Sequence, residues 1–480
     1  MMGADPRLWN DDLAPTTPAQ RNWNWKSFAA LWVGMVACIP TYMLASGLIS
    51  SGLSPMQAIA LVFLGNLIVL VPMLLTGAMG TATGIPFPVL LRASFGPRGA
   101  QVAALARAFV ACGWFGINTW IGGSAIYGVI NLLSHDALAG AALPLLGINA
   151  GQALCFLAFW AVHIYFISRG TESIRWLESL SAPFLLAMGL VLLAWAYTRA
   201  HGFGAMLNAP SGFAPGRAGD RLFWSTIAAS LTAMVGFWAT LALNICDFTR
   251  FARSQKDQVI GQSIGLPLPM ALFSFIGVAV TSATVVIFGQ AIWQPVELAA
   301  HLGGFGAIIA LVVICLCTLT VNMAANVVSP SYDFSNLAPS KISFARGGYI
   351  TAGIGLLIFP WRLLESAGTY IFSWLVGYSA LLGPIAGIMI ADYYIVRKRK
   401  LAVEELFTYD GRYRGTGGWN LKGLAALAVG VAPNLPGFLH SVRLVERVPP
   451  TWDAIFTGAW FVGFFTSAAV YVLLNPFGDK

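Results

Sequence analysis

Two pairs of residues, each spaced by one helical turn, are the part of this sequence best suited to bind a ligand. Asn322 and Asn326 stand four residues apart in TLTVNMAANVVSP, and Trp114 and Asn118 have the same spacing in CGWFGINTWIGG. Residues four apart lie on one face of a helix. A buried amide costs about 2 kcal/mol or more unless it is hydrogen-bonded. Two helices that each turn an amide inward therefore predict a pocket for a flat, polar, neutral molecule.

The apolar segments contain very little charge. The carboxylates nearest to them, Glu178, Asp247, Glu365 and Asp392, fall at segment ends. A transporter of an amino acid, amine or metal ion usually places a charge or a helix terminus against its ligand. The candidate inward groups are amides and hydroxyls, which favours an uncharged ligand, although any one of them could instead hydrogen-bond a neighbouring helix. They are Asn118, Thr119, Asn244, Thr318, Thr320, Asn322 and Asn326.

Aromatic residues near the amides add a second kind of recognition. A carboxamide offers one acceptor and two donors in a plane, so it can pair with the amide or imide edge of uracil, hydantoin, allantoin or a purine. The flat face of such a ring can stack on an aromatic side chain, which contributes about 1–3 kcal/mol per base in nucleic-acid proteins. Trp114, Phe237 and Trp238 are the candidate stacking residues. The alternative is that they pack in the core or face lipid, as most of the 17 Trp and 31 Phe residues must.

The composition indicates a polytopic membrane protein. Of the 480 residues, 58% are hydrophobic and only 10% are charged, against about 25% charged in a soluble domain. Residues 1–27 are polar and show no signal-peptide pattern. The net charge of +8 lies mostly in short loops, where membrane orientation explains it better than nucleic-acid binding does. We therefore expect no nucleic-acid partner.

The apolar segments predict twelve transmembrane helices. Residues 1–27 would form a cytoplasmic tail, 28–396 a ten-helix transport core, 397–420 a basic cytoplasmic linker, and 421–480 two further helices with a short tail. Most of the 27 Lys and Arg residues lie inside if both termini are cytoplasmic, as in a multi-pass protein of the inner (plasma) membrane. The predicted spans are 28–49, 55–75, 102–133, 151–168, 177–198, 222–245, 268–289, 307–328, 347–361, 367–390, 421–438 and 454–474.

Helix-breaking residues occupy equivalent places in two successive sets of five spans. The first span contains Gly34 and Pro40, and the sixth has Gly236 at its centre. Interrupted helices at matching positions of two halves indicate a transporter binding site. The alternatives are a simple kink at Pro40 and a packing role for Gly236. In the tenth span, Gly377 and Gly383 are candidate hinges of a gate.

The same unwinding predicts a candidate cation site. A broken helix frees backbone carbonyls that can coordinate sodium, here around Gly34 and Ala37. In the eighth span, Cys317 and Thr320 share one face. The pair Cys315-x-Cys317 has the wrong spacing for zinc. All six cysteines are expected to be small buried hydrophobes, and the five scattered histidines are expected to lie outside the site.

Several stretches together resemble the nucleobase:cation symporter-1 family, whose members include hydantoin, allantoin, uracil and purine permeases. They are NWNWKSFAALWVGM, GWFGINTW, GFWATLALNICDFTRFA, TVNMAANVVSP and LLGPIAGIMIADYYIVRKR. The resemblance runs from about Trp23 to about Arg414 and more weakly through the last two spans. It implies an all-α fold of leucine-transporter type, with inverted five-helix repeats at about residues 28–198 and 222–396 and two additional C-terminal helices.

The resemblance also implies a ligand-binding arrangement. The ligand would lie between Trp114 and Trp238, with hydrogen bonds from Asn118 and Asn326 and with Asn322 as the upstream amide. Asn118 stands where glutamine is common in the family, so its side chain is one methylene shorter. The exact substrate is therefore left open.

A sodium site is implied in the same way. It would use the backbone carbonyls of Gly34 and Ala37 together with groups at Cys317, Thr320 and Val321. The sodium-dependent hydantoin member has a hydroxyl residue where this chain has Val321, and valine offers no side-chain oxygen. Sodium and proton coupling are therefore both left open, with no other cofactor expected.

The implied function is cation-coupled import of a neutral nucleobase or cyclic ureide by alternating access. The partners would be that small molecule and membrane lipid. The alternative is an amino-acid or amine transporter on the same scaffold. The sequence contains no H-E-x-x-H motif and no paired intramembrane aspartates, so we expect that the protein is not an enzyme.

Overall fold

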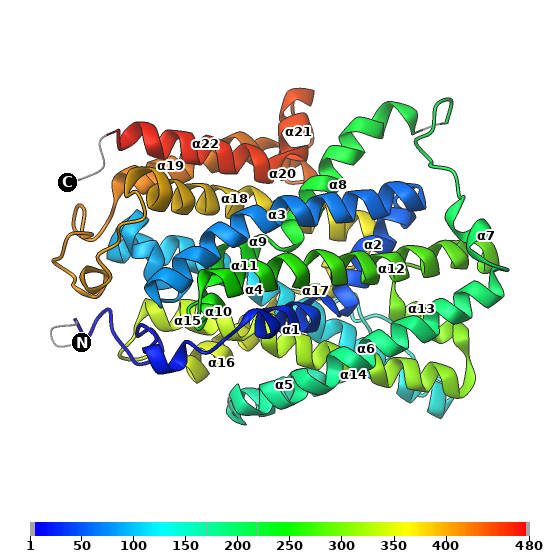
Figure 1. The fold of residues 1–480 in the computed structure, drawn as a ribbon. Helices are drawn as coiled ribbons and strands as arrows, with labels where there is room; N and C mark the ends of the chain where they lie inside the picture. The colour runs from blue at the N-terminus through cyan, green and yellow to red at the C-terminus, as the bar shows by residue number, and fades with distance from the viewer. Residues whose placement is uncertain (1–4, 170, 218, 477–480) are drawn as a thin grey trace.

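The computed structural model describes residues 5–169, 171–217 and 219–476, and the side chains of residues 171–183 are outside this description. Every regular element within the described residues is a helix. Most helices run in a common direction, and the two termini lie at the same end of the molecule (Figure 1). The first half contains α1 (Trp25–Val36), α2 (Ile39–Ser50), α3 (Pro55–Thr83), α4 (Phe87–Ser134), α5 (Ala150–Arg169), α6 (Thr171–Arg199) and α7 (Phe203–Leu207). The all-α prediction is confirmed.

The second half repeats this pattern of long and broken helices. It contains α8 (Phe223–Phe237), α9 (Ala239–Asn244), α10 (Cys246–Thr249), α11 (Gln255–Gly265), α12 (Pro267–Phe288), α13 (Pro295–Leu302), α14 (Gly304–Asn326), α15 (Val328–Leu337), α16 (Phe344–Leu357) and α17 (Pro360–Leu363). It continues with the π-helix η3 (Thr369–Leu375), α18 (Val376–Ala391) and η4 (Asp392–Val396). The last helices are α19 (Leu421–Val431), α20 (Leu435–Ser441), α21 (Pro450–Thr457) and α22 (Ala459–Leu474).

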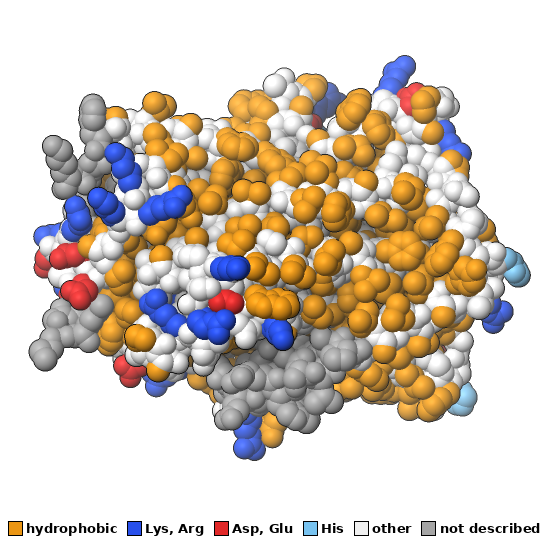
Figure 2. Space-filling model, viewed as in Figure 1, with side chains coloured by type: hydrophobic (Ala, Val, Ile, Leu, Met, Phe, Trp, Pro, Cys, Tyr) orange, Lys and Arg blue, Asp and Glu red, His pale blue; other side chains and the backbone are white. Residues whose placement is uncertain are grey.

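The molecular surface has the character of a membrane protein. Hydrophobic side chains cover a broad field of the face in Figure 2, and many Lys and Arg side chains gather towards the end that holds the termini. Among the described residues, seven helices are long and apolar enough to cross a membrane, or up to nine if each of two bent pairs is one span. The structure thus supports a multi-pass membrane protein, and the number of twelve spans stays a prediction.

The first predicted span is broken in its middle. Helix α1 ends before Ala37, whose ψ of 72° is not helical, and Cys38 is extended. The chain bends by 56° between α1 and α2. Pro40 follows the break in the first turn of α2, where a missing N–H costs nothing because the first four N–H groups of a helix have no intrahelical partner. Gly34, by contrast, lies within α1.

The sixth predicted span is broken two residues after the expected position. Helix α8 ends at Phe237 and α9 begins at Ala239, so the break is at Trp238 rather than at Gly236. Gly236 instead permits close packing on the tenth span: a Cβ added there would lie 2.9 Å from the Leu375 carbonyl. The Tyr378 hydroxyl also donates to the Gly236 carbonyl at 2.8 Å.

The glycines of the tenth span are packing positions. A Cβ on Gly383 would lie 2.6 Å from the Trp460 carbonyl, and one on Gly377 would lie 3.0 Å from the Phe438 ring. The departure from α-helical geometry in this span occurs earlier, in η3. The hinge assignment of these two glycines therefore gains no support, because both hold α18 against the last helices, α20 and α22 (Figure 1).

Several predicted spans have different limits from those expected, and the second continues to Thr83 rather than to residue 75. The third begins well before residue 102, since α4 starts at Phe87 and kinks at Gly96, where φ is 79°. The twelfth is not one continuous helix, because α21 and α22 meet near Gly458 at an 86° bend. The segment after the tenth span packs on the α4 kink, where the backbone N–H of Asn420 donates to the Phe95 carbonyl at 2.8 Å.

Candidate functional site

A small cavity lies where the two broken spans meet α4 and α14. Its volume is about 40 Å³, room for only a few water molecules. The α1–α2 break contributes Cys38, and the α8–α9 break contributes Trp238. Every lining residue is uncharged: Met35, Cys38, Pro40, Trp114, Asn118, Phe237, Trp238, Thr240, Leu241, Val321, Ala325 and Asn326. Five of the six predicted substrate-binding residues are among them.

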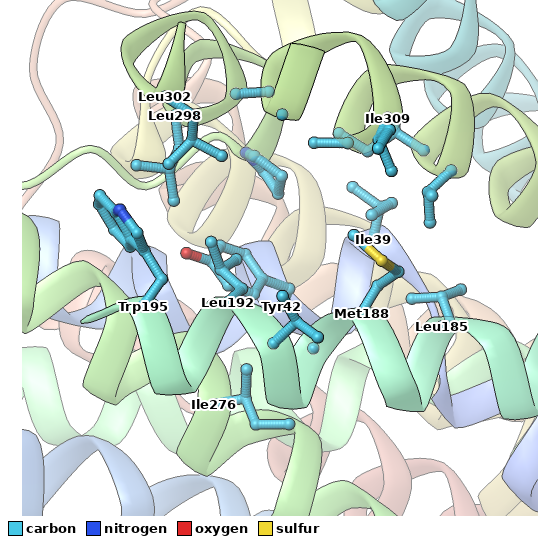
Figure 3. Close-up of a pocket in the computed structure, with 18 of the residues that line it drawn as sticks. Ile39, Tyr42, Leu185, Met188, Leu192, Trp195, Ile276, Leu298, Leu302 and Ile309 are labelled. Carbon is cyan, nitrogen blue, oxygen red and sulfur yellow. The ribbon is translucent and has the colours of Figure 1, made fainter. Parts of the chain in front are cut away.

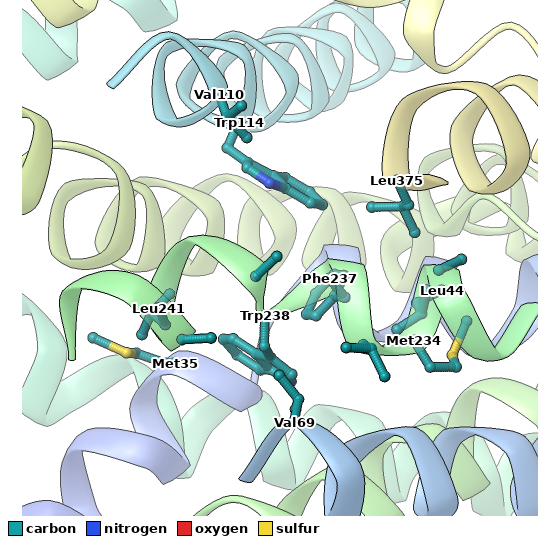
Figure 4. Packing of buried hydrophobic residues seen from close by; sticks show 14 of the residues in the cluster. Met35, Leu44, Val69, Val110, Trp114, Met234, Phe237, Trp238, Leu241 and Leu375 are labelled. Atoms are coloured by element: carbon teal, nitrogen blue, oxygen red, sulfur yellow. The ribbon is translucent and has the colours of Figure 1, made fainter. Parts of the chain in front are cut away.

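Aromatic rings form two walls of this cavity. Trp114 projects from α4 towards the α8–α9 break, where Phe237 and Trp238 lie (Figure 4). The Trp114 and Phe237 rings meet edge to face, with centroids 5.3 Å apart. Trp238 is packed edge to face on Phe237 at 4.9 Å and on Trp32 at 5.2 Å. Since Trp114 and Trp238 are both buried, packing fixes the planes against which a flat ligand would lie.

The amide of Asn118 is held by its own helix. Its Nδ2 donates to the Trp114 carbonyl at 3.0 Å. Its Oδ1 has no partner among the described residues, although Asn118 is only 1% exposed. An unpaired buried acceptor is costly, so this oxygen is a natural partner for a ligand N–H. The one-turn spacing in the sequence places the Trp114 indole and the Asn118 amide on the same face of α4.

The two asparagines of α14 occupy different positions. Asn326 lines the cavity, and its Nδ2 donates to Asn322 Oδ1 at 2.9 Å. Asn322 is fully buried behind Asn326, with its Nδ2 donating to the Phe115 carbonyl at 3.1 Å. The same Nδ2 lies 3.0 Å from His163 Nε2. Asn322 therefore supports the cavity wall rather than forming it.

The threonines that were candidate inward groups hydrogen-bond their own helices. Thr119 donates to the Phe115 carbonyl at 2.7 Å, and Thr320 donates to the Cys317 carbonyl at 2.9 Å. Thr318 makes the equivalent bond to the Ile314 carbonyl. This satisfies the hydroxyls locally, which is the alternative that the sequence left open for them.

Asn244 also lies away from the cavity. Its Nδ2 contacts Ser329 and lies 3.3 Å from Asp247 Oδ2. The same buried region holds an ion pair that the sequence did not predict, between Arg107 Nη1 and Asp333 Oδ2 at 3.3 Å. Both side chains of the pair are fully buried. Asp333 follows the predicted eighth span, 307–328, and is 226 positions from Arg107, so only tertiary packing brings the two together.

The candidate cation residues lie beside the cavity rather than in its lining. The Cys38 amide donates to the Val36 carbonyl at 2.7 Å, although a regular α-helix would direct it to the Gly34 carbonyl. The break at Ala37 thus releases Gly34 from its usual partner. Cys317 and Thr320 are buried on α14.

Larger cavities also lie elsewhere among the described residues. One of about 480 Å³ is formed by α2, α6, α12, α13 and α14 (Figure 3). The side chains labelled there are apolar apart from the Tyr42 hydroxyl and the Trp195 indole nitrogen. Another of about 450 Å³ lies between α4 and α13 and includes Asn131, Asp136 and Gln152. The first has no carboxamide in its lining, and the lining of the second includes the carboxylates of Asp136 and Glu297. The small cavity, with its uncharged lining, therefore remains the candidate substrate site.

Comparison with known proteins gives a consistent result. The sequence model of permeases for cytosine/purines, uracil, thiamine and allantoin matches residues 15–463. The purine-uracil permease NCS1 of Arabidopsis thaliana is 45% identical over 480 residues, which cover 99% of this chain and 79% of the plant protein. The allantoin permease of Bacillus subtilis is 39% identical over 471 residues, covering 98% of this chain and 93% of the bacterial protein.

A solved structure shares the fold. Mhp1, a nucleobase-cation-symport-1 family transporter solved in a closed conformation with bromovinylhydantoin bound, superimposes with a TM-score of 0.78 and 26% identity. The match covers 98% of each chain. The resemblance and the leucine-transporter-type fold implied by the sequence motifs are thereby confirmed.

Proposed function

Because this chain belongs to the family of permeases for cytosine/purines, uracil, thiamine and allantoin, we propose that it imports a neutral nucleobase or a related cyclic ureide. The observation that carries this proposal is the cavity at the two helix breaks, which combines aromatic walls, carboxamides and an uncharged lining. Uracil, allantoin, hydantoin and a purine are the candidate substrates, in keeping with the names of the relatives.

The proposed recognition uses the face and the edge of the ring separately. Trp114 and Trp238, with Phe237, contact the two faces, and Asn118 and Asn326 pair with the polar edge. A ligand with a full charge would lose hydration without gaining an ionic partner, because the lining residues are uncharged. This argument favours a heterocycle over an amino acid or an amine. It also favours transport over catalysis, since the lining offers no acid–base pair.

Transport would proceed by alternating access around this cavity. At about 40 Å³, the cavity is too small for a heterocycle, so the helices that form it must separate when substrate enters. The protein would lie in the inner (plasma) membrane with both termini in the cytoplasm, consistent with their common end in Figure 1 and with the distribution of basic residues.

A cation would drive uptake. The carbonyls of Gly34 and Ala37 at the α1 break, with Cys317 and Thr320 of α14, form the proposed sodium site. Val321 adds no oxygen and faces the substrate cavity instead. Proton coupling is the alternative that the following assay distinguishes.

The test is uptake by purified protein in proteoliposomes. Radiolabelled uracil and allantoin are offered separately, with an inward sodium gradient, with an inward proton gradient, and with neither. Accumulation of either compound under one gradient supports the proposal and identifies the cation. If neither compound is taken up, and leucine or choline alone stabilises the protein in a thermal-shift panel, the amino-acid or amine alternative replaces it.

A further inference from the structure

A histidine lies directly behind the carboxamides of the cavity. His163 of α5 is fully buried and is not a lining residue. Its ring packs edge to face on Phe115 at 5.0 Å and on Phe159 at 4.8 Å. Its Nδ1 lies 2.9 Å from the Phe159 carbonyl, and its Nε2 lies 3.0 Å from Asn322 Nδ2. Both ring nitrogens are therefore engaged, one of them with the amide that supports Asn326.

The partners of His163 determine which nitrogen carries the proton. A carbonyl oxygen can only accept, so Nδ1 must donate to Phe159 and carry the hydrogen. The amide nitrogen of Asn322 can only donate, so Nε2 must be unprotonated and accept. The geometry thus defines a neutral imidazole with a single tautomer.

The Phe115 carbonyl can only accept, so it fixes the side on which Asn322 Nδ2 lies, and unprotonated His163 Nε2 supports the same orientation. The two Asn322 Nδ2 hydrogens are directed to His163 Nε2 and to the Phe115 carbonyl, at 3.0 and 3.1 Å, with Thr119 Oγ1 more distant at 3.4 Å. Asn322 Oδ1 must then point the other way, where it accepts from Asn326 Nδ2 at 2.9 Å. If either amide rotated by 180°, two acceptors or two donors would face each other inside a buried network.

The chain of hydrogen bonds ends in the cavity. The bond to Asn322 Oδ1 uses one of the two Asn326 Nδ2 hydrogens and fixes the orientation of the amide, so Asn326 Oδ1 and the second hydrogen are left for a ligand. The Asn118 amide is oriented in a similar way: its Nδ2 donates to the Trp114 carbonyl, and its Oδ1 has no partner among the described residues. Both residues line the same cavity, so each can offer a carboxamide oxygen to a ligand N–H.

We propose that His163 is a positioning residue that sets the hydrogen-bond polarity of the cavity, through Asn322 and Asn326, so that the site selects rings with unsubstituted N–H groups. This inference rests on the proposed function for its ligand class, since the selected group is an N–H of the imported heterocycle. The tautomer of His163 itself does not depend on which heterocycle is imported.

Two substitutions separate polarity from packing. His163→Gln keeps an acceptor near the position of Nε2, whereas His163→Phe keeps a flat ring of similar size and removes the acceptor. We expect His163→Phe to raise KM for uracil uptake about tenfold with a smaller change in kcat, because a buried amide hydrogen loses its partner. It should also weaken the discrimination between uracil and its N-methyl derivatives, whereas His163→Gln should stay within about threefold of wild type.

The matched control is His301 of α13. Its Nδ1 lies 2.9 Å from the Glu297 carbonyl, the same one-turn contact that His163 makes, but this residue is exposed. His301→Phe should leave KM and the N-methyl discrimination unchanged. The proposal is overturned if His163→Gln impairs uptake as much as His163→Phe does, because that order would identify a packing role.

A measurement that needs no substrate completes the test. Solid-state ¹⁵N NMR of histidine-labelled protein in which the other four of the five histidines are replaced by Gln should show a neutral His163 ring protonated at Nδ1. A charged ring or an Nε2-protonated ring overturns the proposal even if both variants fail to fold. If wild type takes up no heterocycle, the proposed function fails, and this spectrum still decides whether His163 orients Asn322.

Discussion

Removal of the Trp114 ring should weaken substrate binding by an amount that can be worked from its contacts. One aromatic–base stack contributes about 1–3 kcal/mol, and 1.4 kcal/mol corresponds to a tenfold change. Trp114→Ala should therefore raise KM for uptake by about 5- to 150-fold. The same ring touches Tyr370, Trp374 and Tyr378 of the tenth span. Its loss should also destabilise the fold by about 3–5 kcal/mol.

Two further variants separate these effects. Trp114→Phe keeps a flat face and should raise KM by less than about tenfold. Trp374→Ala removes a ring that packs on Trp114 with centroids 6.2 Å apart but does not line the cavity. It should lower stability and raise KM by less than Trp114→Ala does, because the stacking ring remains and loses only one of its packing partners.

The assay is initial-rate uptake in proteoliposomes at matched protein content, with thermal unfolding measured on the same preparations. Trp224, which is 77% exposed on α8, supplies an inert control as Trp224→Ala. An unchanged KM for Trp114→Ala, or an equal rise for Trp374→Ala, would refute the stacking argument.

Two other outcomes follow from buried contacts. Arg107→Gln should destabilise the protein by about 3–5 kcal/mol, because Asp333 would remain buried without its ionic partner. The double variant Arg107→Gln/Asp333→Asn should unfold at a higher temperature than Arg107→Gln alone. An unfolding temperature of the double variant below that of the single variant would contradict this reasoning. Gly236→Ala should slow uptake without preventing membrane insertion, because the new methyl group meets the Ser379 hydroxyl and the Leu375 carbonyl. The additional substitution Ser379→Ala should restore part of the uptake rate. Uptake at the wild-type rate by Gly236→Ala alone would show that close packing at this position is dispensable.

Local patterns in the sequence were sufficient for an all-α membrane protein and for most of the candidate cavity residues, whereas the leucine-transporter-type fold was implied by the motifs that resemble the family. Trp114 and Asn118 share one helix face, as do Asn322 and Asn326, because each pair is separated by one helical turn. The uncharged lining follows from the lack of carboxylates within the apolar segments. These features are encoded by residues close together in the chain, which is why composition and periodicity predicted them.

Other features depend on contacts between distant segments. The break of the sixth span falls at Trp238, whereas Gly236 packs against the tenth span. His163 is separated from Asn322 by 159 positions, and no local pattern distinguishes it from the other histidines.

The sequence by itself thus determined a bundle of apolar helices with an amide and an indole on matching faces. Only the tertiary structure decided that Asn326 meets the cavity while Asn322 lies behind it, and that a buried histidine fixes the direction of both amides. The physical reason is that helix periodicity specifies which residues share a face. The donor or acceptor role of each amide is instead set by whichever group packing brings against it.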